Sequence, residues 1–166
     1  MTLTQPLRDE HAELIPHVAA LAEAGDAVSG ADLDHLRSMV DASYRFLSEH
    51  LIPHARAEEA ALYPAVQRVV GAPEMTATME RDHVEVGTLT AELAQLRQRL
   101  AAASHLDDDL ANGLRRVLYG LHSLVKVHFA KEEEVYLPLL DARLDEDAAR
   151  AMFAAMHEAG HREDPD

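Results

Sequence analysis

Apolar residues recur along most of this 166-residue chain at intervals of three or four positions. That spacing places them on one face of an amphipathic helix. Four long segments show it, with apolar stripes over residues 7–21, 36–62, 79–100 and 114–139. Sparse glycine and proline separate the segments, which are rich in good helix formers. The pattern predicts an all-α fold, an antiparallel four-helix bundle.

A shorter fifth segment runs from Glu146 to about Gly160 and carries apolar residues such as Met152 and Met156. We expect it to form a short C-terminal helix that packs across one end of the bundle. With 48% apolar residues, a chain of this length can bury one hydrophobic core. We therefore expect residues 1–166 to form a single domain, with the bundle core over about residues 7–140.

Six polar residues fall at positions of the stripes that should face the core. A buried glutamate is costly unless it is paired or bound to a metal ion. These residues are therefore the candidates for chemistry. They are His11, His54, Glu58, His83, His128 and Glu132.

The candidates belong to an internal repeat. The motif His54-x-x-x-Glu58 returns as His128-x-x-x-Glu132, and in both halves a second glutamate follows and a proline lies six residues after the first glutamate. Each motif is preceded by one further core-facing histidine, 43 residues earlier in the first half and 45 in the second. The halves are therefore two helical hairpins of one design.

This spacing favours a metal site. Histidine and glutamate four positions apart lie on the same side of a helix, so both can reach one point in the bundle interior. Four imidazoles and two carboxylates would meet there, a donor set that suits iron, with manganese and zinc as alternatives. If both carboxylates bridge two metals, open positions are left for dioxygen, peroxide or nitric oxide. A metal-free core of hydrogen-bonded His and Glu is the alternative, and the repeated spacing argues against it.

The sequence resembles the hemerythrin-like HHE cation-binding domains, whose halves each carry an early histidine and a later His-x-x-x-Glu-Glu ahead of Tyr-Pro or Leu-Pro. The resemblance covers about residues 7–140. It implies two non-haem irons. One would be held by His11 and His54 and the other by His83 and His128, and Glu58 and Glu132 would bridge the two.

Two departures from the oxygen-carrying members of that family bear on function. Gly87 stands where those proteins have a second histidine one turn beyond His83, and Glu132 follows His128 by four residues instead of five. A more open site favours peroxide turnover over reversible oxygen binding. We therefore expect reaction with hydrogen peroxide, dioxygen or nitric oxide, most concretely a catalase-like disproportionation. The alternatives are an iron or oxygen sensor without enzymatic activity and an iron donor for the repair of iron centres.

The charge and composition of the chain limit the classes of molecule that it is expected to bind. Thirty acidic residues against 15 basic ones give a net charge of −15, which disfavours nucleic acid and anionic lipid. The absence of cysteine excludes disulfides and thiolate ligands. No signal peptide is evident at the amino terminus, so a cytoplasmic location is expected. The expected ligand is a small diatomic molecule or peroxide, and a protein partner and the oligomeric state stay open.

Other residues near the stripes are candidates for additional or supporting roles at the site. His17, His50 and His122 flank the stripes and are candidates for a seventh ligand. Tyr63 and Tyr136 lie near the site, and we expect them to pack there.

The string His157-Glu158-x-x-His161 matches the motif of zinc peptidases. A glycine interrupts it, and an acidic, histidine-rich chain produces such strings by chance. We do not assign it a metal.

Overall fold

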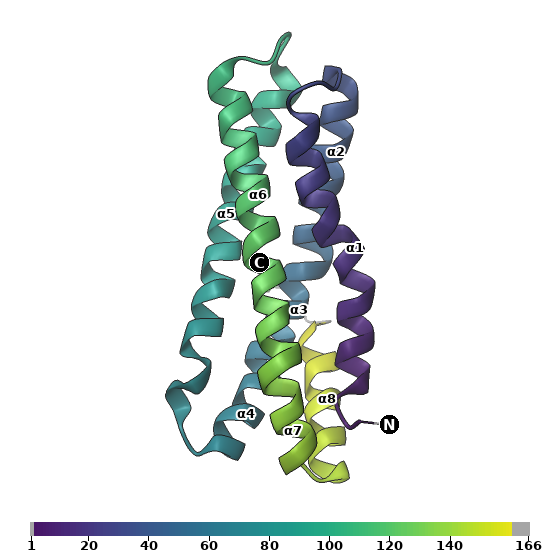
Figure 1. The fold of residues 1–166 in the computed structure, drawn as a ribbon, viewed down its shortest axis with the longest axis vertical. Helices are drawn as coiled ribbons and strands as arrows, with labels where there is room; N and C mark the ends of the chain where they lie inside the picture. The colour runs from purple at the N-terminus through teal and green to yellow at the C-terminus, as the bar shows by residue number, and fades with distance from the viewer. Residues whose placement is uncertain (1, 161–166) are drawn as a thin grey trace.

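The computed structural model describes residues 2–160, and within that range it contains helices and no strand (Figure 1). Four long helical rods lie side by side, as the apolar stripes predict, and a fifth helix lies next to them. Their helices are α1 (Gln5–Ala27), α2 (Leu33–Phe46), α3 (Ile52–Ala57), α4 (Tyr63–Val70), α5 (Ala77–Ala102), α6 (Asp108–Lys131), α7 (Leu137–Arg143) and α8 (Glu146–Gly160).

The second rod (residues 33–70) and the fourth (residues 108–143) contain π turns. These are η1 (Leu47–Leu51), η2 (Glu58–Leu62) and η4 (Glu132–Tyr136), and a 3₁₀ turn, η3 (Pro73–Thr76), leads into α5. Each π turn ends two residues before a proline. Proline has no N–H to donate to the carbonyl four residues back, so the regular ladder is already broken there and a wider turn costs less.

The interior contains two separate apolar clusters. The larger one joins α1, α2, α5 and α6 and includes Leu21, Leu36 and Leu118. The smaller one lies toward α4, α7 and α8 and includes Leu62 and Met79. On each rod the core-facing polar residues lie between members of the two clusters, so the polar candidates form a layer between them.

Helix α8 lies along α3 and η2 instead of across the end of the bundle (Figure 1). Its buried side chains Ala149, Met152 and Met156 form a stripe that packs into the smaller cluster. Gly160 comes close to the second rod, where a Cβ at this position would lie 3.8 Å from the Ala57 Cβ. The helix thereby covers the rod that carries His54 and Glu58. No helix in the described part of the chain is long and apolar enough to cross a membrane.

The helix ends follow local rules. The Asp32 side chain caps α2 by accepting hydrogen bonds from the backbone N–H groups of Asp34 and His35. The Asp107 side chain caps α6 by accepting one from a backbone N–H group in its first turn. Gly71 ends α4 at φ +75°, in the left-handed region that favours glycine.

This geometry predicts opposite effects for two glycine substitutions. Gly71→Ala should lower the free energy of unfolding by about 1 kcal/mol, because a Cβ strains the left-handed conformation. Gly87→Ala lies inside α5, where a Cβ would meet nothing within 4 Å, and should raise that free energy by up to about 1 kcal/mol. Urea denaturation of the two variants measures both. Equal effects would contradict the conformational assignment of Gly71.

Candidate metal centre

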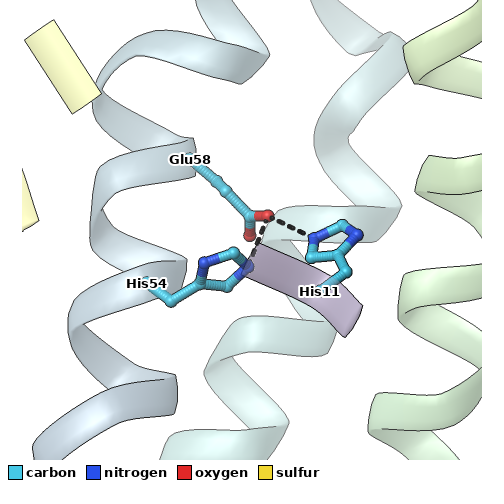
Figure 2. A group of neighbouring side chains, drawn as sticks. All are labelled: His11, His54 and Glu58. Carbon is cyan, nitrogen blue, oxygen red and sulfur yellow. Dashed lines mark ion pairs between the residues drawn. The ribbon is translucent and has the colours of Figure 1, made fainter. Parts of the chain in front are cut away.

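The six polar candidates come from all four rods and meet at one place. His11 lies on α1 and His83 on α5, while the two His-x-x-x-Glu motifs lie where α3 joins η2 and where α6 joins η4. Both glutamates are 0% exposed, and the histidines are buried or nearly so. In Figure 2 one carboxylate oxygen of Glu58 points between the imidazoles of His11 and His54.

Glu58 faces both histidine pairs, one with each oxygen. Its Oε1 lies 2.9 Å from His54 Nε2 and 3.6 Å from His11 Nε2. Its Oε2 lies 3.3 Å from His83 Nε2 and 3.9 Å from His128 Nε2. Two groups of possible ligand atoms, each within 4.8 Å, therefore share this carboxylate.

Glu132 repeats this arrangement from the opposite rod. Its Oε2 lies 3.4 Å from His11 Nε2, and its Oε1 lies 3.4 Å from His128 Nε2. Each carboxylate thus offers one oxygen to each histidine pair, which is the geometry that two bridging carboxylates require.

A second layer of carboxylates orients the imidazoles. Within each hairpin, the acid that precedes the first candidate histidine accepts a hydrogen bond from the second candidate histidine. Glu10 accepts from His54 Nδ1 at 2.9 Å, and Asp82 accepts from His128 Nδ1 at 3.1 Å. Sequence analysis missed both acids, although each directly precedes a candidate histidine.

Between the hairpins, the acid after each core glutamate bonds to the early histidine of the other half. Glu59 accepts from His83 Nδ1 and Glu133 from His11 Nδ1, both at 2.8 Å. All four Nδ1 atoms therefore donate outward, and all four Nε2 atoms face the centre. This is the arrangement that metal-binding histidines adopt in proteins.

Cations hold two of these outer acids in turn. Arg8 pairs with Glu133 and also with Asp141, and Lys131 pairs with Asp82. Burial raises the pKa of Asp82, but the hydrogen bonds from Lys131 and His128 outweigh it and lower that pKa. The Asp82 carboxylate therefore stays ionised at neutral pH.

The inner layer contains buried polar atoms without a hydrogen-bond partner. They are His11 Nε2, His54 Nε2, both carboxylate oxygens of Glu58 and Glu132 Oε2. Buried polar atoms without a hydrogen bond are rare in proteins, and here the attraction between carboxylates and imidazoles compensates for only part of their lost hydration. Nitrogen and oxygen atoms that converge in this way fit a pair of metal cations.

The two core carboxylates perturb each other. Burial raises the pKa of Glu58, but the imidazoles of His54, His11 and His128 outweigh it and hold that pKa well below its usual range. The pKa of Glu132 is raised by burial and by the negative charge of Glu58. Burial lowers the pKa of His128, but Glu132 and Glu58 raise it to about 10. Without a metal the cluster therefore retains protons, and cations would displace them.

Tyr63 is a member of the centre that sequence analysis placed among packing residues. Its side chain is fully buried, and its hydroxyl donates to Glu132 Oε1 at 3.0 Å. The Tyr63 hydroxyl oxygen also lies 3.2 Å from His83 Nε2 and 3.2 Å from His128 Nε2. In an α-helix, Tyr63 and Glu58, five positions apart, would point about 140° apart. The π turn η2 is wider, so both face the interior.

Tyr136 has no such role. It follows its core glutamate by four residues where Tyr63 follows by five, and its hydroxyl donates to the Met75 carbonyl at 2.8 Å. Leu137 occupies the position that corresponds to Tyr63. Of these two tyrosines, only Tyr63 from the first half of the repeat therefore places its hydroxyl at the centre.

None of the histidines considered as a seventh ligand lies at the centre. His17 stacks on Phe46, His122 Nδ1 donates to the Val18 carbonyl at 3.0 Å, and His50 lines a surface pocket with Glu10. The Tyr63 hydroxyl lies at the centre instead, 3.2 Å from His83 Nε2 and from His128 Nε2. The zinc-peptidase string cannot be followed, because His161 lies outside the described residues.

A helical bundle with a buried histidine and carboxylate centre defines a class of bundle metalloproteins. Within that class, the chain matches the model of the hemerythrin HHE cation-binding domain over residues 2–118, and it belongs to this family. The match ends before His128 and Glu132, whose assignment therefore rests on the internal repeat and the geometry. No curated protein and no solved structure matches the chain significantly.

The shared carboxylates predict the metal content of variants. The purified protein should bind two irons per chain, and the double variant Glu58→Ala, Glu132→Ala should lose most of both, because each carboxylate serves both positions. Glu49→Ala is the control, since Glu49 is exposed and pairs only with Arg45 in the described structure. Metal analysis after anaerobic reconstitution measures this. Normal iron content in the double variant would refute the ligand assignment.

Metal loading should also stabilise the fold. A ligand that binds only the native state, at a free concentration of roughly a thousand times its Kd, adds about 4 kcal/mol to the free energy of unfolding. A bound metal would also neutralise the two buried carboxylates. The loaded protein should therefore melt clearly above the metal-free protein in calorimetry. Equal melting temperatures with metal bound would place that metal outside the bundle core.

Proposed function

We propose that the protein holds two non-haem irons at this centre and disproportionates hydrogen peroxide. The observation that carries the proposal is the position of the two carboxylates, each with one oxygen toward each histidine pair. His11 and His54 would hold one iron, His83 and His128 the other, and Glu58 and Glu132 would bridge them. Imidazole with carboxylate and without thiolate suits iron, and manganese or zinc are weaker candidates.

When bound, the iron pair would supply two electrons to one peroxide and take two from the next. The overall reaction converts two peroxides into two waters and one dioxygen. The protein contributes fixed ligand geometry, because every imidazole is held at Nδ1 by a carboxylate. It would also limit the contact of the centre with water, since both core glutamates and most of the histidines are buried between two apolar clusters.

Tyr63 would hold a proton at the centre. Burial and the charges of Glu58 and Glu132 raise the pKa of its hydroxyl far above the usual value, so the phenol stays protonated in the metal-free protein. A bound cation would oppose that shift. A buried O–H within reach of the reacting oxygens favours cleavage of an O–O bond over reversible binding, because the departing oxygen needs a proton.

The space beside the centre supports a small substrate. A cavity of about 20 Å³ is lined by the side chains of His54, Glu58, His83 and His128, together with apolar neighbours. That volume is about the size of one water molecule, so it excludes large substrates, and even a two-atom molecule such as peroxide, dioxygen or nitric oxide would need small shifts of the lining side chains. The net charge of −15 likewise supports a small-molecule partner over nucleic acid or an anionic membrane.

Tyr63→Phe tests the function against a matched control. The variant should keep its iron, and it should lose about a hundredfold in peroxide turnover because the proton donor is gone. Tyr136→Phe removes a hydroxyl that contacts only the Met75 carbonyl and should retain full turnover. Oxygen evolution with an electrode measures both.

Two outcomes would contradict the proposal. If the iron-loaded protein releases no oxygen from peroxide, iron sensing or iron donation becomes the better assignment. Equal rates for Tyr63→Phe and the unaltered protein would remove the tyrosine from the mechanism.

A further inference from the structure

A groove of about 520 Å³ opens on the surface between α1 and α6, which lie side by side in Figure 1. Its walls are mostly apolar, and small exposed side chains such as Ala12 and Ala130 line it. Ile15, 54% exposed, stands at its rim. We call this space the α1–α6 groove.

The groove reaches down to the metal centre. Its floor includes His11, which is 1% exposed, and Phe129, which is 5% exposed. The Phe129 ring stacks on the His11 imidazole, with 4.4 Å between ring centroids, and meets His54 edge-on at 5.8 Å. One aromatic ring therefore covers two of the candidate ligands on this side.

Phe129 also lines the small cavity of about 20 Å³ beside Glu58. Most residues around that cavity are buried, and Ala55 and His83 on its α3 and α5 side are partly exposed. The Phe129 side chain thus forms a wall of both spaces and separates the groove from the position where a ligand would meet the metals.

We propose that the α1–α6 groove is the access route by which small uncharged molecules reach the centre, and that the Phe129 ring is its gate. The inference rests on the proposed function only for the identity of the ligand. Arg8, Lys126 and Glu133 also line the groove, but movement of the Phe129 ring breaks no hydrogen bond, because the ring is apolar and its contacts are packing contacts. Rotation of the ring would join the groove to the inner cavity, on the timescale of other gating motions.

The walls determine what passes. Dioxygen and nitric oxide are small and weakly hydrated, so they lose little on entering a largely apolar groove, whereas hydrogen peroxide is small and uncharged but gives up hydrogen bonds to water there. Larger reductants or peroxides would stop at Phe129. The gate would thereby restrict access to the centre by size.

The test measures binding kinetics instead of turnover. The iron-loaded, reduced protein is mixed with nitric oxide under anaerobic conditions, and association and dissociation are followed by stopped-flow absorption. Phe129→Leu should raise both rates by roughly tenfold, which leaves Kd little changed, because a gate affects the barrier and not the bound state. Ile15→Trp should slow association by roughly tenfold, since it fills the rim.

The chain offers a matched control for the rim variant. Val84 is an apolar, β-branched residue on α5 that is 57% exposed and lines neither space. Val84→Trp should therefore leave association unchanged. Iron content and helical circular dichroism check that each variant is folded and loaded, and Ile15→Trp tests the route even if Phe129→Leu is unstable.

A competing route would pass Ala55, which lines the inner cavity from α3 and occupies the repeat position that corresponds to Phe129. If Ala55→Phe slows association while Ile15→Trp and Phe129→Leu do not change it, the proposed gate is wrong. If the rates shift as expected but the protein releases no oxygen from peroxide, the gate stands and the proposed function fails.

Discussion

The structure depends on the desolvation of two carboxylates. Glu58 and Glu132 have no exposed surface and lie between two apolar clusters, where an uncompensated charge is strongly unfavourable. Their compensation comes from four imidazoles that converge on them from four different rods. The bundle can therefore bury this layer only if all four rods keep their register, so the polar layer specifies the fold as well as the chemistry.

The outer carboxylates extend this constraint to the surface. Each imidazole is held between a core glutamate on one side and an outer acid on the other, and two of those acids are tied to cations on the neighbouring rod. The donors are thus oriented before any ligand arrives, which lowers the entropic cost of binding. The same arrangement explains why a chain of net charge −15 keeps basic side chains such as Arg8 and Lys131 next to the centre.

The two halves are equal in their ligands and unequal around them. The histidines, core glutamates and outer acids follow a pseudo-twofold relation, whereas Tyr63 corresponds to Leu137 and Phe129 corresponds to Ala55. A buried hydroxyl therefore stands beside one histidine pair, and an aromatic ring covers part of the other. Reactivity in a duplicated scaffold arises from such differences, because a fully symmetric centre would treat both ends of a bound molecule alike.

The sequence by itself determined the bundle and the six polar residues of its core. Apolar spacing reports which face of a helix is buried, and histidine and glutamate on that face are conspicuous because they are costly there. Tertiary structure alone decided the roles of Tyr63, Glu10, Asp82 and Phe129. A π turn changes the angular relation between positions five apart, so α-helical periodicity misplaces Tyr63. Contacts such as Glu10 with His54 join different rods, and their geometry exists only once the rods pack.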